Sequence, residues 1–187
     1  MDWLVSNLPR NAVLLVDEAY LDFSGDPRLA SVLPHVKAGR EVVLTRTFSK
    51  IYGMAGLRVG FACARPELIA RMQPYPAGVI SWVSSRGVLA ALGDANLVPA
   101  RRARYARIRA GLCSWLAGHE FRFLEPHANF VMIDCGRDVR GVIPAMISRG
   151  VAPGRPFPPL DHMLRVSIGA EAEMEKFKRV FLEVMRA

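Results

Sequence analysis

The segment TRTFSKIYGMAGLRVGF, residues 45–61, holds the residues best suited to covalent chemistry. Lys50 follows the hydroxyl-bearing Thr47 and Ser49, and Arg58 comes eight residues later within a glycine-rich stretch. A neutral lysine amine forms an imine with a carbonyl group, and the planar fork of an arginine suits a phosphate group. An imine-forming lysine beside phosphate ligands indicates pyridoxal phosphate as the cofactor.

Two residues of the segment VDEAYLDF, Asp17 and Tyr20, fit the same cofactor. The pyridine nitrogen of pyridoxal phosphate needs a carboxylate partner to stay protonated, and Asp17 can supply it. The Tyr20 hydroxyl can donate to the phenolate oxygen of the ring. Taken singly, Asp17 could cap a strand, Lys50 could be a loop lysine and Arg58 could be a surface ion-pair partner. Their occurrence together favours the functional interpretation.

The apolar runs around these residues predict an α/β sheet. The continuous runs at 13–16 and 42–44 are typical of strands buried on both faces. The segment 27–37 between them has the length and apolar spacing of a short helix, so the two strands should be parallel. Ligands of such sheets bind beyond the carboxyl ends of the strands, where Asp17 and Lys50 both lie.

The remainder of the chain predicts one more strand of this sheet, at 58–62, and then an α+β domain. A long helix at 97–117 should join two domains, which we expect at residues 1–95 and 96–187. The other expected elements are helices at 66–72, 81–92, 139–148 and 171–186, a turn in QPYPAG (73–78), and strands in FRF (121–123), NFVMID (129–134) and LRVSI (164–168).

Composition favours a folded protein with a substantial core, since 51% of the 187 residues are hydrophobic and the mean hydropathy is +0.18. No apolar run approaches the ~20 residues of a membrane span, and no secretory signal follows Met1, so we expect a cytoplasmic protein with no membrane partner. Cys63, Cys113 and Cys135 are widely spaced, which predicts buried free thiols. The histidine spacing predicts no metal site.

The net charge of +8 raises nucleic-acid binding as an alternative, because five arginines lie in ARRARYARIRAGL. In the same segment, however, apolar residues such as Tyr105, Ile108 and Leu112 recur at helical spacing. We therefore expect most of the arginines to border an apolar stripe, with their charged ends in solvent, and no nucleic-acid partner. Anionic small-molecule substrates suit the same charge.

VDEAYLDF and TRTFSKIYGMAGLRVGF together resemble the histidinol-phosphate aminotransferase family, within the class I and II aminotransferases. HANFVMID and LRVSIG resemble strands of that family's small domain, so the resemblance covers nearly the whole chain. It implies an α/β fold, namely pyridoxal-phosphate (PLP) transferase fold type I. The chain would comprise a partial large domain with a mainly parallel sheet, followed by a small α+β domain.

The resemblance also implies a role for each candidate residue. Lys50 would form the aldimine with the cofactor and then carry the proton between the substrate Cα and the cofactor. The other roles are pyridinium contact by Asp17, phenolate contact by Tyr20, phosphate binding by Thr47, Ser49 and Arg58, and substrate carboxylate binding by Arg165 with Asn129 nearby. The partners implied are an amino donor, a 2-oxo acid and a second subunit of a homodimer. Asn129 could otherwise cap a strand, and Arg165 could otherwise be an exposed strand residue.

The chain departs from the family in length, because family members are about twice as long. It lacks segments that would supply the first phosphate-binding turn, an aromatic that stacks on the cofactor and a tyrosine from the second subunit. We therefore expect an aminotransferase truncated at its N-terminus. Two alternatives remain: a catalytically silent fragment or interaction module, and a related decarboxylase of a phosphorylated amino acid.

Overall fold

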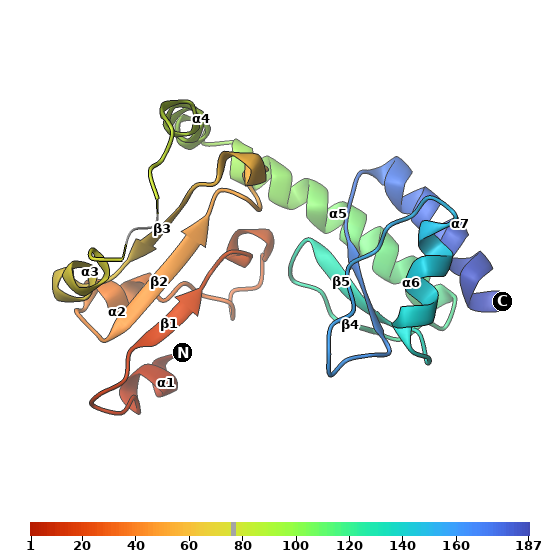
Figure 1. Ribbon diagram of the computed structural model, residues 1–187, viewed down its shortest axis with the longest axis horizontal. Coiled ribbons are helices and arrows are strands. Elements are labelled where there is room, and N and C mark those ends of the chain that lie inside the picture. The colour runs from red at the N-terminus through yellow and green to blue at the C-terminus, as the bar shows by residue number, and fades with distance from the viewer. Residues whose placement is uncertain (76–77) are drawn as a thin grey trace. The chain divides into compact units, whose positions relative to one another are not determined.

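The computed structural model describes residues 1–75 and 78–187 and divides into two compact units, Met1–Arg102 and Ala103–Ala187 (Figure 1). The division falls within the long helix α5 (Leu97–Gly118). The assignment of residues 1–95 to a cofactor-binding domain and 96–187 to a small domain stays a prediction. The turn expected at 73–78 includes Pro76 and Ala77, which lie outside the described residues.

The first unit contains a three-stranded sheet in the order β1 (Leu14–Asp17), β2 (Val42–Thr47) and β3 (Gly60–Cys63). β1 and β2 are parallel, with Asp17 opposite Thr45, which confirms the predicted strand, helix and strand unit. β3 begins two residues later than expected and runs antiparallel to β2. The connection between β2 and β3 contains no α-helix, which is typical of an antiparallel pair.

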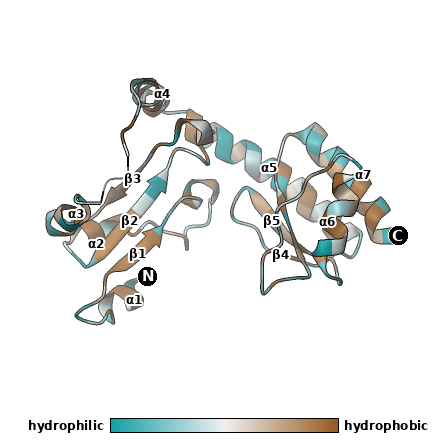
Figure 2. Cartoon of the chain, viewed as in Figure 1, coloured by the Kyte–Doolittle hydropathy of each residue, from teal (hydrophilic) through white to brown (hydrophobic). Residues whose placement is uncertain are grey.

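Burial differs between the two parallel strands. Val42, Val43 and Leu44 are buried, as predicted for β2, and the strand becomes polar toward its carboxyl end (Figure 2). In β1, by contrast, burial alternates and Leu15 is 65% exposed. The expectation that β1 is buried on both faces is therefore wrong. In the described part of the chain β1 is an outer strand, and only one of its faces packs on the cluster of Val32, Val42 and Leu44.

The helices of the first unit agree with the sequence except around residue 30 and at residues 2–6. α2 spans only Leu33–Lys37, not 27–37, because the side chains before it bond to the backbone and form turns. Asp26 Oδ1 accepts from the Arg28 N–H, and Ser31 Oγ accepts from the Leu33 N–H. The remaining helical segments are α1 (Asp2–Ser6), which was not predicted, the short 3₁₀ turns η1 (Leu21–Phe23) and η2 (Ala55–Leu57), α3 (Pro66–Met72) and α4 (Trp82–Gly93).

The second unit is an antiparallel sheet covered by helices, which confirms the predicted α+β architecture. Its strands are β4 (Phe123–Leu124), β5 (Phe130–Asp134) and β6 (Met163–Ser167), in that order. The helices α6 (Val139–Ile147) and α7 (Glu171–Arg186) pack with α5 around one core. That core includes Leu112, Ile133, Leu164 and Phe181, all at most 1% exposed.

The α5 arginines contact protein groups in addition to solvent. Within the second unit, Arg104 and Arg107 pair with Glu171, and Arg109 donates to the Ala128 carbonyl. The expected apolar stripe is present, since Ile108, Leu112 and Leu116 are the buried residues of α5. Arg104, Arg107 and Arg109 thus have partners within the protein.

Of the three cysteines, which are all free, only Cys135 is buried. The expectation of three buried thiols is wrong for Cys63 and Cys113, which are half-buried. Burial raises the pKa of Cys135 to about 11 and also raises the pKa of Cys113, against an opposing effect of Arg109. These thiols are therefore protonated near neutral pH and are poor nucleophiles.

Candidate active site

The candidate site of the first unit lies at the carboxyl ends of the two parallel strands. Asp17 is the last residue of β1, and Lys50 lies three residues beyond the end of β2. The Lys50 Nζ atom lies 5.1 Å from the centroid of the Tyr20 ring. The structure thus brings Lys50 against Tyr20, three residues after Asp17, although 30 positions separate the lysine from the tyrosine in sequence.

The Lys50 Nζ atom contacts an aromatic face and not a carboxylate of the described residues. Among the residues that the structure describes, no carboxylate lies within 4 Å of its Nζ atom, and the side chain is half-buried. The backbone carbonyl of Lys50 accepts from the Gly53 N–H at 2.9 Å, and Gly53 has a φ of 67°. This turn requires the left-handed conformation that glycine adopts at no steric cost, and it fixes the backbone next to the lysine.

Asp17 keeps one carboxylate oxygen available. Its Oδ1 atom accepts from the Ala19 N–H at 3.0 Å, so the side chain does cap the end of its strand. Within residues 1–75 and 78–187, no side chain donates to this carboxylate. A carboxylate has two acceptor oxygens, so the capping role leaves Oδ2 open to an N–H donor from a ligand.

The two hydroxyl residues before Lys50 play different parts. Thr47 Oγ1 accepts from the Ser49 N–H at 3.0 Å and donates to the Val59 carbonyl at 3.4 Å. Thr47 therefore holds the turn between β2 and Lys50, and its hydroxyl is already engaged by the protein. The Ser49 hydroxyl makes no hydrogen bond with the described residues, so it is the freer donor of the two.

Arg58 occupies an unusual backbone conformation, with φ 54° and ψ 47°. Residues other than glycine adopt this left-handed region at a small energetic cost, and such residues occur often at functional sites. The guanidinium is exposed and donates to the Ala55 carbonyl at 2.9 Å. Its other N–H groups have no partner in the described part of the chain and remain available to an anion.

Tyr52, two residues after Lys50, packs on the ring of Phe48. The centroid of its ring lies 4.8 Å from the centroid of the Phe48 ring. Burial, aided by the nearby carboxylate of Asp22, raises the pKa of the Tyr52 phenol against the opposing charge of Arg46. The phenol is therefore neutral at physiological pH and contributes packing.

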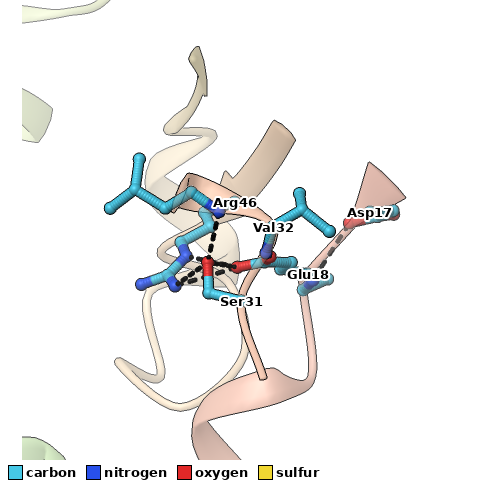
Figure 3. A network of polar contacts seen from close by, with 7 residues as sticks. Asp17, Glu18, Ser31, Val32 and Arg46 are labelled. Atoms are coloured by element: carbon cyan, nitrogen blue, oxygen red, sulfur yellow. Dashed lines mark hydrogen bonds and ion pairs between the residues drawn. The ribbon is translucent and has the colours of Figure 1, made fainter. Parts of the chain in front are cut away.

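A network that the sequence analysis missed lies next to the site (Figure 3). The buried carboxylate of Glu18, the residue after Asp17, accepts hydrogen bonds from Ser31, Val32 and Arg46. A glutamate directly after an apolar strand and an arginine between Thr45 and Thr47 in a second strand were the available signals. Charged residues in such positions need partners when the strands are buried.

The two remaining candidates, Arg165 and Asn129, belong to the second unit. Arg165 lies in β6, and its guanidinium stacks on the Phe130 ring at 4.1 Å from the centroid. The Arg165 carbonyl accepts from the Gly154 N–H at 2.7 Å. Asn129 directly precedes β5, and its carbonyl accepts from the Ile168 N–H at 2.8 Å. Neighbouring strands therefore place the two residues on one antiparallel ribbon.

Two other kinds of feature are absent from the described ranges 1–75 and 78–187. No group of three or more histidine, cysteine, aspartate or glutamate side chains is arranged to hold a metal ion. No helix there combines the length and the apolar composition needed to cross a membrane.

Comparison with known proteins places this arrangement in a family. Residues 4–181 match the model of the family "Aminotransferase class I and II". The histidinol-phosphate aminotransferase of Oleidesulfovibrio alaskensis is 37% identical to this chain over a match that covers 98% of it. That of Moorella thermoacetica is 33% identical over a match that covers 99% of the chain. In both cases the match covers 49% of the relative, so the chain spans about half the length of these curated relatives.

The fold comparison agrees with the sequence comparison. The crystal structure of histidinol-phosphate aminotransferase from Sinorhizobium meliloti, in complex with pyridoxal-5'-phosphate, matches 99% of this chain and 53% of its own. The TM-score is 0.85 at 28% sequence identity. The fold expected from the sequence, that of a partial fold type I aminotransferase, is confirmed. The chain belongs to the class I and II aminotransferases.

Proposed function

We propose that this chain forms part of a PLP-dependent aminotransferase that moves an amino group between an amino acid or phosphorylated amine and a 2-oxo acid. The observation that carries the proposal is the Lys50 amine, which lies over the Tyr20 ring at the carboxyl edge of β1 and β2 without a carboxylate partner in the described residues. The relative from Sinorhizobium meliloti, which binds pyridoxal phosphate, supports the same cofactor here.

The residues of the first unit fit this cofactor. The open Oδ2 atom of Asp17 would accept from the protonated ring nitrogen, and Tyr20 would donate to the phenolate oxygen. The Ser49 hydroxyl and the unpaired N–H groups of Arg58 would hold the phosphate, with Thr47 fixing the turn between them. Bound pyridoxal phosphate supplies an electron sink that stabilises negative charge at the substrate Cα.

The chain's own side chains would then bind the substrate and move the proton. Lys50, whose Nζ atom lies over the Tyr20 ring, would act as a base toward the Cα proton and return it as an acid. Arg165 would bind the substrate carboxylate through two parallel hydrogen bonds. Phe130 supports the guanidinium plane of Arg165, and Asn129 lies at the start of the next strand.

The test of this function is chemical trapping with borohydride. The chain is incubated with pyridoxal phosphate and reduced, and the labelled peptide is identified by mass spectrometry. We expect the label on Lys50 and not on Lys37, Lys176 or Lys178, the only other lysines. A label on another lysine would show that the assignment of Lys50 is wrong. In a catalytically competent assembly, a new amino acid from a 2-oxo acid would mark transamination, whereas carbon dioxide release would mark decarboxylation.

Replacement of Arg165 by lysine should weaken use of the amino donor more than binding of the cofactor. Lysine keeps the charge but cannot form the two parallel bonds of a guanidinium with a carboxylate. In an active assembly we expect kcat/KM for the donor to fall by roughly 10-fold or more, on the order of 1.4 kcal/mol or above. Arg155→Lys is the matched control, because that arginine also lies over an aromatic ring, that of Phe157. An unchanged kcat/KM in Arg165→Lys would assign carboxylate binding to another residue.

The assembly and location of the protein are part of the same proposal. We infer a homodimer and a cytoplasmic location, with small-molecule substrates and neither a nucleic acid nor a membrane as partner. Membership of the class I and II aminotransferases supports the small-molecule substrates. The partners that Arg104, Arg107 and Arg109 have within the protein support the expectation of no nucleic-acid partner.

A further inference from the structure

The carboxylate of Glu18 is buried and fully engaged, although none of the proposed chemical roles falls to it (Figure 3). Its Oε2 atom accepts from Ser31 Oγ at 2.9 Å and from Arg46 Nε and Nη2 at 3.1 and 2.8 Å. Its Oε1 atom accepts from the Val32 N–H at 2.6 Å. The Glu18 side chain is 4% exposed and that of Arg46 is 29% exposed. This is an ion pair between a buried carboxylate, whose two oxygens both accept hydrogen bonds, and a half-buried guanidinium.

The network joins three segments that frame the candidate site. Glu18 directly follows Asp17, and its N–H donates to the Thr45 carbonyl at 2.9 Å, so the pairing of β1 with β2 continues to this residue. Arg46 directly precedes Thr47. Ser31 belongs to the loop before α2. The network therefore connects the ends of both strands with the chain that crosses between them.

The ion pair and the candidate site residues lie on opposite faces of the sheet. Successive side chains of an extended strand point to opposite faces, so Arg46 points away from the face of Thr45 and Thr47. The same alternation separates buried Glu18 from exposed Asp17. The ion pair thus lies on the face opposite to Asp17 and Thr47, where it can fix their backbone without contacting a ligand.

We propose that Glu18 and Arg46 are positioning residues that hold Asp17 and the segment 47–50 at the spacing that the cofactor requires. The inference rests on the proposed function. A buried ion pair seldom adds stability beyond what apolar residues would provide, and its best-supported benefit is a defined geometry. Sites work when supporting bonds lock the groups that contact the ligand. Here the bonds of Glu18 and Arg46 connect the ends of β1 and β2 on the face opposite to Asp17 and Thr47.

The test compares Glu18→Gln with Glu41→Gln in the full 187-residue chain. Glu41 directly precedes β2 and pairs with Arg65, so the control breaks an arginine–carboxylate pair at the other end of the same strand. Each variant is incubated with pyridoxal phosphate well below half-saturation of the unaltered chain and reduced with borohydride. Under this condition the yield of labelled Lys50 is proportional to the association constant.

We expect Glu18→Gln to lower the yield per folded molecule at least about 10-fold, because small displacements of paired groups cost this much or more. The pH midpoint of the bound cofactor's absorbance should also shift, since in the proposed function Asp17 would contact the ring nitrogen. Glu41→Gln should change neither property. Ser31→Ala, which removes one donor without unpairing the charge, should fold normally and give an intermediate yield.

Folded fractions are measured by circular dichroism and thermal unfolding. The proposal would be overturned if labelling of Glu18→Gln fell only in proportion to its folded fraction and Ser31→Ala were labelled like the unaltered chain. The network would then have a purely structural role. Absence of Lys50 labelling in the unaltered chain would instead overturn the proposed function. In that case amide hydrogen exchange, measured without cofactor, still tests the positioning role. That role requires the amides of residues 44–50 to exchange faster in Glu18→Gln than in Glu41→Gln.

Discussion

Lys50→Arg should lower kcat for amino transfer by at least about 10³-fold, because the variant loses both the nucleophilic amine and the proton-transfer group. Arginine keeps the positive charge near Tyr20, but its guanidinium stays protonated at any physiological pH. The measurement requires an active assembly, which we expect when this chain is combined with the N-terminal half of the Oleidesulfovibrio alaskensis relative. Initial rates with a saturating amino donor and 2-oxo acid report kcat.

The matched control is Lys37→Arg, which makes the same chemical change on α2, at an exposed position. It should retain the full rate and the borohydride label on Lys50. Added small amines provide a second check, because a diffusible base can partly replace a missing proton-transfer group. We expect methylamine to raise the rate of Lys50→Arg and to leave that of Lys37→Arg unchanged. Retention of normal turnover by Lys50→Arg would remove this lysine from the mechanism.

The sequence predicted the fold well wherever apolar spacing alone decides structure. α3 and α7 have the predicted bounds, and the two parallel strands lie where the apolar runs are. The exposure of Leu15 could not be predicted, because a continuous apolar run does not state how many faces of the strand are covered. The shortened α2 has a local cause, since Asp26 and Ser31 bond to nearby N–H groups in place of a helical turn.

The candidate site was predictable in part for a related reason. Residues next to strand ends, such as Asp17 and Lys50, can be located once the strands are known, because parallel strands end at one edge of the sheet. Glu18 was missed because its partners lie 13 to 28 positions away in sequence. A single sequence gives no measure of such distant pairings. The engagement of Thr47 by the backbone of Ser49 was likewise visible only in the structure.

Residues 1–187 by themselves should turn over substrate at less than roughly 10⁻³ s⁻¹, against an ordinary kcat of about 10 s⁻¹. The described residues of the first unit leave large apolar side chains in solvent, including Leu15 at 65%, Trp82 at 73% and Val83 at 71% exposed. Exposed apolar groups on an outer strand and a helix are typical of surfaces that pack against further protein and otherwise promote aggregation. The curated relatives contain about as much chain again outside the matched region.

Cofactor binding should survive in weakened form when these residues stand alone. Lys50, Asp17 and Arg58 are all in the first unit, so we expect a reversible adduct that borohydride can trap. Catalysis requires more, because water has free access to an open site, where it hydrolyses the imine and weakens the electrostatic contacts. Addition of the N-terminal half of the Oleidesulfovibrio alaskensis relative to this chain should therefore raise the rate. Addition of the same half to the Lys50→Arg variant of this chain should not. Turnover of an amino donor and a 2-oxo acid at ordinary enzyme rates by purified residues 1–187 alone would contradict this expectation, and would mean that the exposed apolar surface has no part in completing the site.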